Sequence, residues 1–446
     1  MNAMPTVHRL RILALGALAL APALAKAQPT RRIIEIESPD FRPYPVAIPD
    51  VRGVGSEAAE AAAGAITRAL RFDFDLAAQF EVSNPKSYLA DPEKEGMTAP
   101  TIRFEDWLSV GAEGLLKGVV RQEGDGLRAE LRFFEVARGQ AFFSQTFVVS
   151  SPEDGREAGH AFADALVEAL TGTPGIFRTR IAVVRRAESG RELWVMDLDG
   201  AHLRPVTRNG SINLLPSWTP DGTSLIFTSY LRHNPNLYRI RVDGSGLSLL
   251  SGERGLNTGG AMSPASGKVA VTLSRDGNSE IYTMNPDRTG LTRLTREWAI
   301  DSSPSWSPDG SRIAFVSSRL GDPHIFVMNA DGSDPRRLTF RGNYNTTPDW
   351  SPKGDLIAFT ARDERNVFDI FTVDANTQVI RRLTQDQGNN EEPSFAPDGQ
   401  HIVFTSTREG RSQVWVMAVD GSNQRRLTQE GGFTTPAWSP RRGATR

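Results

Sequence analysis

Few residues of this chain combine the types and the spacing that catalysis or metal binding requires. Cysteine is absent from all 446 positions, which excludes thiol nucleophiles and thiolate metal sites. The six histidines are scattered without the spacing of a His-Glu-x-x-His metal motif, and no Gly-x-Ser-x-Gly nucleophile motif occurs. Oxygen-rich segments could hold Ca²⁺, but no motif demands it. The sequence therefore predicts no catalytic residue, no cofactor and no metal ligand.

The side chains that recur at a regular interval are carboxamides and one carboxylate. They follow one another at spacings of 44, 44, 44 and 45 residues, and an aromatic residue takes the sixth place after another 43. The recurring positions are Asn213, Asn257, Asp301, Asn345, Asn390 and Phe433. Gathered in one ring, they would form a polar collar that faces a ligand. Because Asn and Asp also cap turns, the sequence leaves open both this collar and a purely structural role.

The motif Pro-x-Trp-Ser-Pro-Asp-Gly is repeated at the same interval. Its second proline stands seven positions after each collar residue. These prolines are Pro220, Pro264, Pro308, Pro352, Pro397 and Pro440. Three short strand-like segments follow each full copy, and the strand around the next Pro-x-Trp completes a group of four. Four-stranded units of about 40–45 residues are typical of the blades of a β-propeller. The aromatic residue of the motif is large enough to cover the neighbouring blade.

The two ends of the repeat array complement each other. Residues 181–207 have the later strands of a unit without its Pro-x-Trp strand, whereas residues 436–440 have only that strand. We therefore expect the C-terminal strand to complete the first unit, which gives six blades and leaves no long free edge. The predicted fold of residues 178–446 is an all-β six-bladed β-propeller.

The N-terminal part of the chain predicts export and a short tail. A basic start, an apolar run and small residues predict a secretory signal peptide over residues 1–27, cleaved between Ala27 and Gln28. In the tail, residues 28–44, polar and apolar side chains alternate as in a strand before prolines interrupt the pattern. The alternating residues are Arg32, Ile33, Ile34, Glu35, Ile36 and Glu37. They could form an edge strand of the next domain, which the residues alone favour, or an arm that adds to a partner's sheet.

A small α/β domain is expected between the tail and the propeller, over residues 45–172. Two amphipathic helical patterns, at residues 56–70 and 159–170, enclose three strand patterns with hairpin turns. The net charge of −2 gives the chain no electrostatic footprint for nucleic acid or an anionic membrane.

In the order of these segments the chain resembles the TolB family, the periplasmic components of the Tol–Pal system. The resemblance rests on the signal peptide, the tail, the α/β domain and the six repeats with Pro-x-Trp-Ser-Pro-Asp-Gly and Asp-Gly-Ser…Arg-Leu-Thr motifs, and it covers essentially the whole chain. It implies a periplasmic, monomeric, non-enzymatic adaptor that reaches the envelope only through its partners. Such proteins bind the lipoprotein Pal at the propeller and TolA through the tail, and they support outer-membrane integrity and constriction during cell division.

The resemblance also implies where the partners bind. The family's Pal-contacting segments correspond to residues 256–259 and 301–303, and TolA would bind the tail. The predicted contacts at the propeller mouth are Asn213, Leu256, Asn257, Gly259, Asp301, Ser302, Ser303, Asn345, Asn390 and Glu391. Two other classes stay open from the residues alone, namely the propeller of a hydrolase and a glycan-binding propeller.

Overall fold

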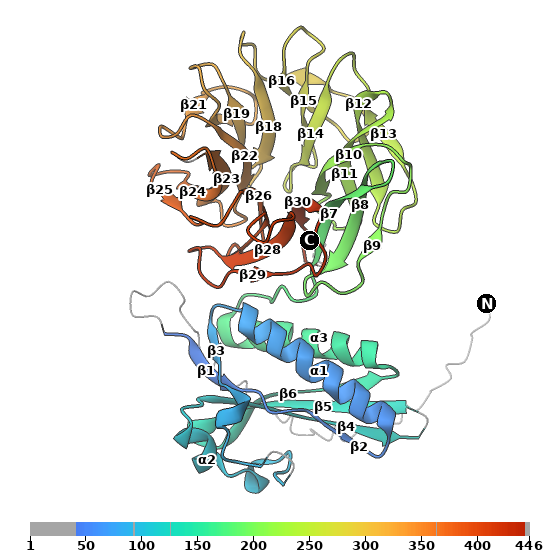
Figure 1. The fold of residues 1–446 in the computed structure, drawn as a ribbon, viewed down its shortest axis with the longest axis vertical. Coiled ribbons are helices and arrows are strands. Elements are labelled where there is room, and N and C mark those ends of the chain that lie inside the picture. Colours follow the sequence, from blue (N-terminus) through green and yellow to red (C-terminus); the bar gives the residue numbers. More distant parts are fainter. Residues whose placement is uncertain (1–41, 92–93, 125, 363, 442–446) are drawn as a thin grey trace, which may run out of the picture.

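The computed structural model of the chain describes residues 42–91, 94–124, 126–362 and 364–441. An α/β domain precedes a six-bladed β-propeller, which confirms the predicted fold class (Figure 1). The predicted signal peptide with its cleavage site, Ala27 and Gln28, lies outside the described residues, as do the tail residues from Arg32 to Glu37. Within the described ranges, no helix is long and apolar enough to cross a lipid bilayer.

One mixed sheet forms the outer layer of the α/β domain. Its strands lie in the order β3–β1–β4–β5–β6, and β2 pairs with β4. They are β1 (Tyr44–Ala47), β2 (Arg52–Val54), β3 (Phe80–Val82), β4 (Gly114–Glu123), β5 (Gly126–Glu135) and β6 (Gln140–Val149). Strands β4, β5 and β6 form an antiparallel meander. Leu127, Ala129 and Leu131 alternate along β5 as buried residues, so one face of the sheet is apolar.

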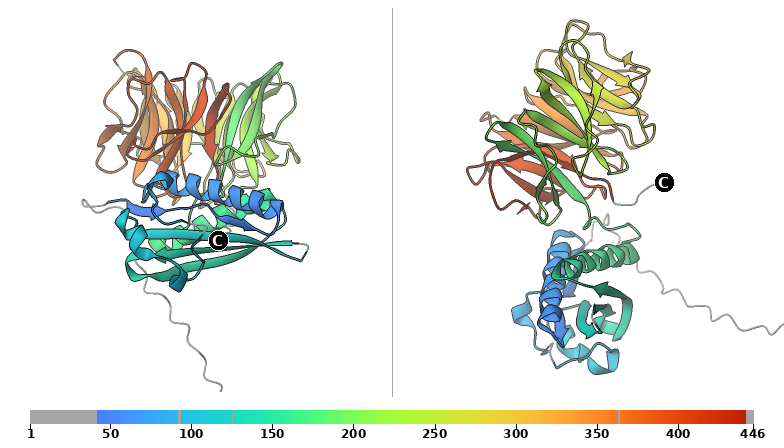
Figure 2. Two further views of the ribbon diagram at one scale, coloured as in Figure 1. Left: turned by 60° about the horizontal axis from the view of Figure 1, so that its bottom comes forward. Right: turned by 90° about the vertical axis from the view of Figure 1, so that its right-hand side faces the viewer.

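Two long helices cover this apolar face and lie between the sheet and the propeller (Figures 1 and 2). They are α1 (Glu57–Leu76) and α3 (Pro152–Thr171). Both extend beyond the predicted segments, residues 56–70 and 159–170. Helix α1 continues because Phe74 and Leu76 are buried against the core, and α3 starts earlier because the Ser151 hydroxyl caps its first turn.

Close contact between α1 and α3 depends on small residues. A Cβ atom on Gly155 would lie 2.8 Å from the carbonyl oxygen of Ala62, and one on Gly159 would lie 2.9 Å from the Cβ of Ala69. On the far side of the sheet the long connection between β3 and β4 packs around the buried Trp107. It contains α2 (Phe104–Ser109) and the 3₁₀ turns η1 (Pro85–Ser87) and η2 (Ala99–Thr101), while η3 (Val136–Arg138) joins β5 to β6.

The propeller consists of six four-stranded antiparallel sheets, numbered here as blades 1 to 6. Blade 1 contains β30 (Phe433–Trp438), β7 (Arg180–Ala187), β8 (Gly190–Asp197) and β9 (Arg204–Pro205). Blade 2 contains β10 (Asn213–Trp218), β11 (Ser224–Arg232), β12 (Asn234–Arg241) and β13 (Ser248–Ser251). Blade 3 contains β14 (Asn257–Met262), β15 (Val269–Leu273), β16 (Glu280–Met284) and β17 (Thr292–Arg293).

The last three blades repeat this arrangement. Blade 4 contains β18 (Asp301–Trp306), β19 (Arg312–Ser317), β20 (His324–Asn329) and β21 (Arg336–Arg337). Blade 5 contains β22 (Asn345–Trp350), β23 (Leu356–Arg362), β24 (Phe368–Asp374) and β25 (Ile380–Arg382). Blade 6 contains β26 (Asn390–Phe395), β27 (His401–Ser406), β28 (Gln413–Ala418) and β29 (Arg425–Arg426).

The C-terminal strand closes the ring, as the complementary ends of the repeat array predict. Strand β30 pairs with β7, with Thr434 opposite Val184 and Trp438 opposite Ile181. Blade 1 is thus assembled from both ends of the propeller sequence, and no blade is left with an unpaired inner strand. The motif aromatics are buried between blades, which makes them core residues; they are Trp218, Trp306, Trp350, Phe395 and Trp438.

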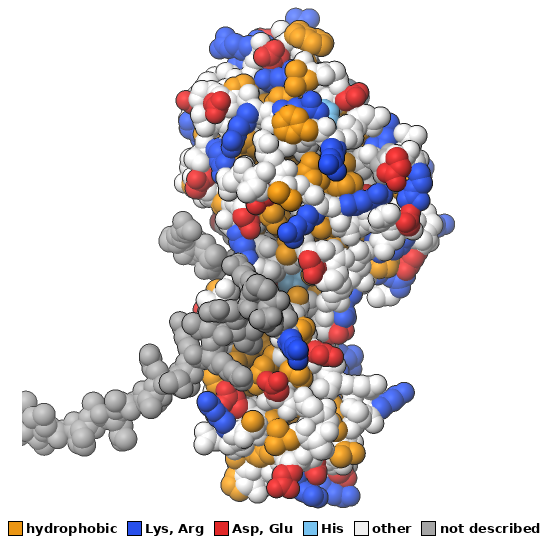
Figure 3. All heavy atoms as spheres, turned by 90° about the vertical axis from the view of Figure 1, so that its left-hand side faces the viewer, with side chains coloured by type: hydrophobic (Ala, Val, Ile, Leu, Met, Phe, Trp, Pro, Cys, Tyr) orange, Lys and Arg blue, Asp and Glu red, His pale blue; other side chains and the backbone are white. Residues whose placement is uncertain are grey.

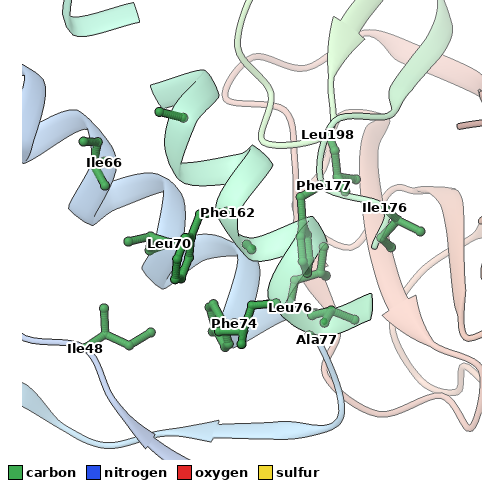
Figure 4. Packing of buried hydrophobic residues seen from close by; sticks show 14 of the residues in the cluster. Ile48, Ile66, Leu70, Phe74, Leu76, Ala77, Phe162, Ile176, Phe177 and Leu198 are labelled. Carbon is green, nitrogen blue, oxygen red and sulfur yellow. The ribbon is translucent and has the colours of Figure 1, made fainter. Parts of the chain in front are cut away.

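The hydrophobic core of the α/β domain continues into the propeller. Phe74 and Leu76 of α1 and Phe162 of α3 belong to one buried cluster with Phe177 of the linker and Leu198 of blade 1 (Figure 4). The two domains therefore share buried apolar surface, which stabilises their contact.

Candidate functional site

The inner strands β10, β14, β18, β22, β26 and β30 lie in a ring (Figure 1). Their residues line a central channel. Its cavity has a volume of about 540 Å³ and is lined by the motif prolines and the residues beside them. Successive strands of a blade run in opposite directions, so each end of the channel opens on a different set of loops. We call the face with the loops that lead into the inner strands the distal face, and the opposite one the proximal face.

Every inner strand bends at its third residue, where it faces the channel. The register with the second strand slips there, and the backbone adopts a left-handed conformation. These residues and their φ angles are Leu215 (53°), Gly259 (64°), Ser303 (54°), Thr347 (48°), Glu392 (59°) and Thr435 (51°). Only one of the six is glycine, so five positions carry backbone strain that the surrounding blade must offset.

Threonine hydroxyls of the preceding blade stabilise these bends. The Ser303 N–H donates to Thr272 Oγ1 at 3.2 Å, and the Glu392 N–H donates to Thr360 Oγ1 at 2.9 Å. The neighbouring side chains add bonds between blades, because Ser305 Oγ accepts from the Trp350 N–H at 3.0 Å. The channel wall is thus a hydrogen-bonded ring.

Among the described residues, two charged side chains line the channel, and both are engaged in the wall. The Glu392 carboxylate accepts from the N–H and the hydroxyl of Thr435 at 2.5 and 3.0 Å. The Asp349 carboxylate accepts from the Phe395 N–H at 2.6 Å, and burial raises the pKa of Asp349 to about 7. Among the described residues, no cluster of three or more His, Asp or Glu side chains could hold a metal ion.

The predicted polar collar does not face a ligand. Asn213, Asn257, Asp301, Asn345 and Asn390 are at most 1% exposed, and each starts an inner strand inside the blade wall. Asn257, for example, accepts from the Ser251 hydroxyl at 2.6 Å and donates to the Gly255 carbonyl at 3.1 Å. The hypothesis of a ligand-facing collar is therefore wrong, and the structural alternative, in which these residues cap turns, describes their bonds.

These buried amides also connect the strands of neighbouring blades. Asn390 donates to Asp369 Oδ1 at 3.1 Å, and the Thr384 hydroxyl donates to the same carboxylate at 2.7 Å. Between blades 1 and 2, Asn213 donates to Glu192 Oε2 at 3.0 Å, and the Thr207 hydroxyl donates to that same oxygen. At both of these blade junctions a threonine hydroxyl and the collar residue meet at one buried carboxylate.

The other predicted contacts at the propeller mouth lie closer to solvent. Leu256, Ser302 and Glu391 are partly exposed on the distal side, and Gly259 and Ser303 border the channel. The structure therefore brings these five residues to the distal end of the channel while it buries the five collar residues behind them.

Sequence reasoning missed the most exposed apolar residues of the distal face. Trp298 is 79% exposed, and Ile300, Leu320, Phe340 and Tyr344 are also exposed. Figure 3 shows hydrophobic side chains interspersed with Lys and Arg on the propeller surface. The signal in the sequence was the apolar residue directly before several collar positions, as in Ile300 before Asp301.

The proximal face holds a buried ionic contact with the α/β domain. His160 of α3 is 1% exposed, and its Nδ1 lies 2.8 Å from Asp73 Oδ2 of α1. Its Nε2 lies 3.3 Å from Asp199 Oδ2, in the turn between β8 and β9, and Arg156 binds the same carboxylate at 2.6 Å. Burial alone lowers the pKa of His160, but Asp73 and Asp199 outweigh it and raise the pKa to about 10.

Blade 6 contributes a second part of this junction. His401 Nε2 donates to the carbonyl of Leu76, at the end of α1, at 3.1 Å, and Asn423 donates to the carbonyl of Asp75 at 2.9 Å. Arg441 donates to the linker carbonyl of Gly175 at 3.0 Å. The α/β domain is therefore fixed to blades 1 and 6 on the proximal face, which leaves the distal face open (Figure 2).

Comparison with known families matches both domains. The model described as the TolB beta propeller domain matches residues 167–368 and 363–445, and the TolB amino-terminal domain matches residues 32–142. The chain is 45% identical over 231 residues to the Tol-Pal system protein TolB of Anaeromyxobacter dehalogenans (strain 2CP-C), covering 52% of each chain. It is also 45% identical over 228 residues to that of Myxococcus xanthus (strain DK1622), covering 51% of each. The chain thus spans about half the length of the curated relatives it matches.

A solved structure extends the similarity to both domains together. The crystal structure of TolB from Acinetobacter baumannii aligns with a TM-score of 0.77 at 28% sequence identity, and the alignment covers 90% of this chain and 98% of that one.

Proposed function

The chain belongs to the TolB family, and from that premise we propose that it is a periplasmic protein-binding adaptor of the Tol–Pal system. It binds the lipoprotein Pal through the distal face of the propeller and TolA through residues 28–44. It acts as a monomer after cleavage between Ala27 and Gln28, and it supports outer-membrane integrity and constriction during cell division.

The observation that carries this proposal is the exposed apolar surface of the distal face. Trp298, Ile300 and Phe340 are large hydrophobic residues that are exposed in loops of this face. Exposed apolar clusters on a rigid scaffold are typical of protein-binding surfaces. The channel acids Asp349 and Glu392 are engaged in hydrogen bonds with the wall, which favours binding over catalysis. Of the predicted contacts, Leu256, Gly259, Ser302, Ser303 and Glu391 remain candidates for Pal binding.

Two binding measurements test the proposal. The purified chain, starting at residue 28, is titrated against the soluble domain of Pal and, separately, against the C-terminal domain of TolA. We expect saturable binding of both, and deletion of residues 28–37 should abolish TolA binding while Pal binding and the circular-dichroism spectrum stay unchanged. Turnover of peptide or ester substrates without binding of either protein would contradict an adaptor role.

A further inference from the structure

One position near the start of the third strand of a blade lies at the centre of a buried polar contact. In blades 3 and 5 a carboxylate occupies this position, and an arginine of the fourth strand pairs with it. The pairs are Glu280 with Arg293 and Asp369 with Arg382. In blade 4 the corresponding residue is His324, 44 residues after Glu280 and 45 before Asp369. An imidazole thus takes the place of a carboxylate beside an arginine.

The ring of His324 is 4% exposed, and nitrogen donors face it on both sides. An Arg337 guanidinium nitrogen lies 2.7 Å from Nε2. The Asn345 side-chain nitrogen lies 2.7 Å from Nδ1, and the Thr339 hydroxyl lies 3.3 Å from the same atom. A guanidinium can only donate, so Nε2 has to accept with a lone pair. The contact therefore requires the neutral form of His324.

The charges around His324 oppose its protonation. Among the described residues, no carboxylate is in contact with the ring. Asp322, in the exposed turn before β20, favours the charged form, and Arg337 opposes it. Elsewhere in blade 4, Asp301 and Arg319 pair with each other at 2.8 Å. Burial and Arg337 outweigh Asp322 and lower the pKa of His324 from its ordinary value of 6.5. Protonation would remove the acceptor on Nε2 and place two cations side by side.

The side chains that contact this imidazole also hold the loop of residues 338–344, on the distal face. The Cζ of Arg337 lies 5.0 Å from the centroid of the Phe340 ring. Phe340 is 60% exposed, so the guanidinium supports a ring that is largely open to solvent. At the other end of the loop, Asn345 donates to the carbonyl of Arg341 at 3.1 Å. A change at the imidazole therefore reaches both ends of the loop.

We propose that the contact between His324 and Arg337 is a pH-sensitive switch, in which protonation of the imidazole releases Arg337 and loosens the loop of residues 338–344. The sign follows from linkage. Because the unfolded or opened chain binds the proton more readily than the closed one, the stabilising contact is complete above pH 6.5 and is lost as the pH falls below it. The inference does not depend on the identity of any partner, so it stands or falls separately from the proposed function.

Amide hydrogen exchange of the full mature chain tests the switch. It is measured at about pH 7.5 and about pH 5.5 and corrected for the intrinsic effect of pH on exchange. Exchange in residues 338–344 of the unmodified chain should be faster by about 5-fold or more at the lower pH. Residues 383–389, the equivalent loop of blade 5, should show no such change, because Asp369 takes the place of the histidine there.

Two substitutions remove the titrating ring and keep an acceptor in its place. His324→Glu copies blade 3, where Glu280 pairs with an arginine, and His324→Gln copies blade 6, where Gln413 accepts from a threonine hydroxyl. Both should abolish the additional exchange at the lower pH. His233→Gln is the matched control, since this histidine is exposed between β11 and β12, and it should leave the additional exchange unchanged.

The switch is overturned if the unmodified chain shows no additional exchange at the lower pH, or if both variants show the same increase. A second measurement needs no stable variant. In the unmodified chain, the histidine NMR signal of His324, assigned by its absence in His324→Gln or from sequential assignment, should change only below about pH 6.5. A ring that is already charged at about pH 7.5 overturns the switch as well.

Discussion

His160 Nδ1 lies 2.8 Å from Asp73 Oδ2 in the interior of the domain junction. The opposite ring nitrogen lies 3.3 Å from Asp199, so one imidazole connects both long helices with blade 1. Removing it takes the cation away from the buried Asp73 carboxylate, whereas Asp199 keeps its bond with Arg156. We expect His160→Gln to lower the free energy of unfolding by about 3 kcal/mol, measured by urea denaturation at pH 7. His202→Gln is the control, since that side chain is 48% exposed and its loss should cost less than about 1 kcal/mol. Equal losses would contradict a stabilising role of the buried contact between His160, Asp73 and Asp199.

The pH dependence of the junction has a defined sign. The pKa of His160 is raised from 6.5 to about 10, so its stabilising contribution is complete below pH 6.5 and is lost as the pH rises toward 10. The unfolding free energy of the unmodified chain should therefore fall more steeply between about pH 7 and pH 10 than that of His160→Gln. Parallel pH profiles would contradict a charged His160.

Asp349 should destabilise the propeller once it ionises. Its pKa is raised from 3.8 to about 7 by burial beside the channel, so the folded state favours the neutral acid and stability falls as the pH rises through this range. We expect Asp349→Asn to raise the melting temperature at pH 8 and not at pH 4, because an amide oxygen can still accept from the Phe395 N–H.

Asp309→Asn is the matched comparison for Asp349. Hydrogen bonds from Ser307 and Ser311 lower the pKa of Asp309 to about 2, so its stabilising contribution is present above pH 3.8 and is lost as the pH falls toward 2. This substitution should lower the melting temperature at pH 8. The same sign of change for both variants at pH 8 would contradict the assignment.

The buried amides should matter for folding and not for partner affinity. Asn257 makes hydrogen bonds through both its oxygen and its nitrogen, and Asn257→Ala leaves several of those partners unsatisfied. We expect a loss of about 2 kcal/mol in unfolding free energy, with Pal affinity per folded molecule unchanged. Asn376→Ala, at an exposed turn, should be neutral. If Asn257→Ala weakened Pal binding without lowering the unfolding free energy, the hypothesis of a ligand-facing collar would be supported instead.

Truncation of two tryptophans should change the unfolding free energy by very different amounts. Trp438 is buried in the closing strand, and its Nε1 donates to Thr179 Oγ1 at 2.8 Å. Trp438→Ala should cost about 4 kcal/mol in unfolding free energy, whereas Trp298→Ala should change it by less than about 0.5 kcal/mol. A large loss from Trp298→Ala would mean that its loop supports the fold.

The propeller could be predicted because its signals in the sequence are local turn motifs that recur at a fixed interval. Each Pro-Asp-Gly turn sets the backbone by itself, and the interval fixes the number of blades, so no distant contact had to be known. The burial of Asn213 and its equivalents could not be predicted. The sequence places them at strand starts but does not reveal whether a side chain points into the wall or toward solvent.

The contacts of the domain junction and the exposure of Trp298 could not be predicted from the sequence, for a different reason. His160 is 87 residues from Asp73 and 39 from Asp199, and no periodicity links the three positions. Trp298 lies in a loop, and the sequence of a loop does not determine whether an apolar residue is buried or exposed. Its exposure follows from Asn278 and Glu280 of the adjacent blade 3 hairpin, which hold the loop backbone.

Hydrogen–deuterium exchange of the full mature chain, with and without the soluble domain of Pal, tests the account's central claim most directly. If the protein is an adaptor that binds Pal on the distal face, added Pal should slow amide exchange in residues 252–256, 294–300 and 338–344. Exchange in residues 398–401 and 420–425, at the proximal junction, should stay the same. Slower exchange confined to the proximal junction, or no change at saturating Pal, would contradict the claim.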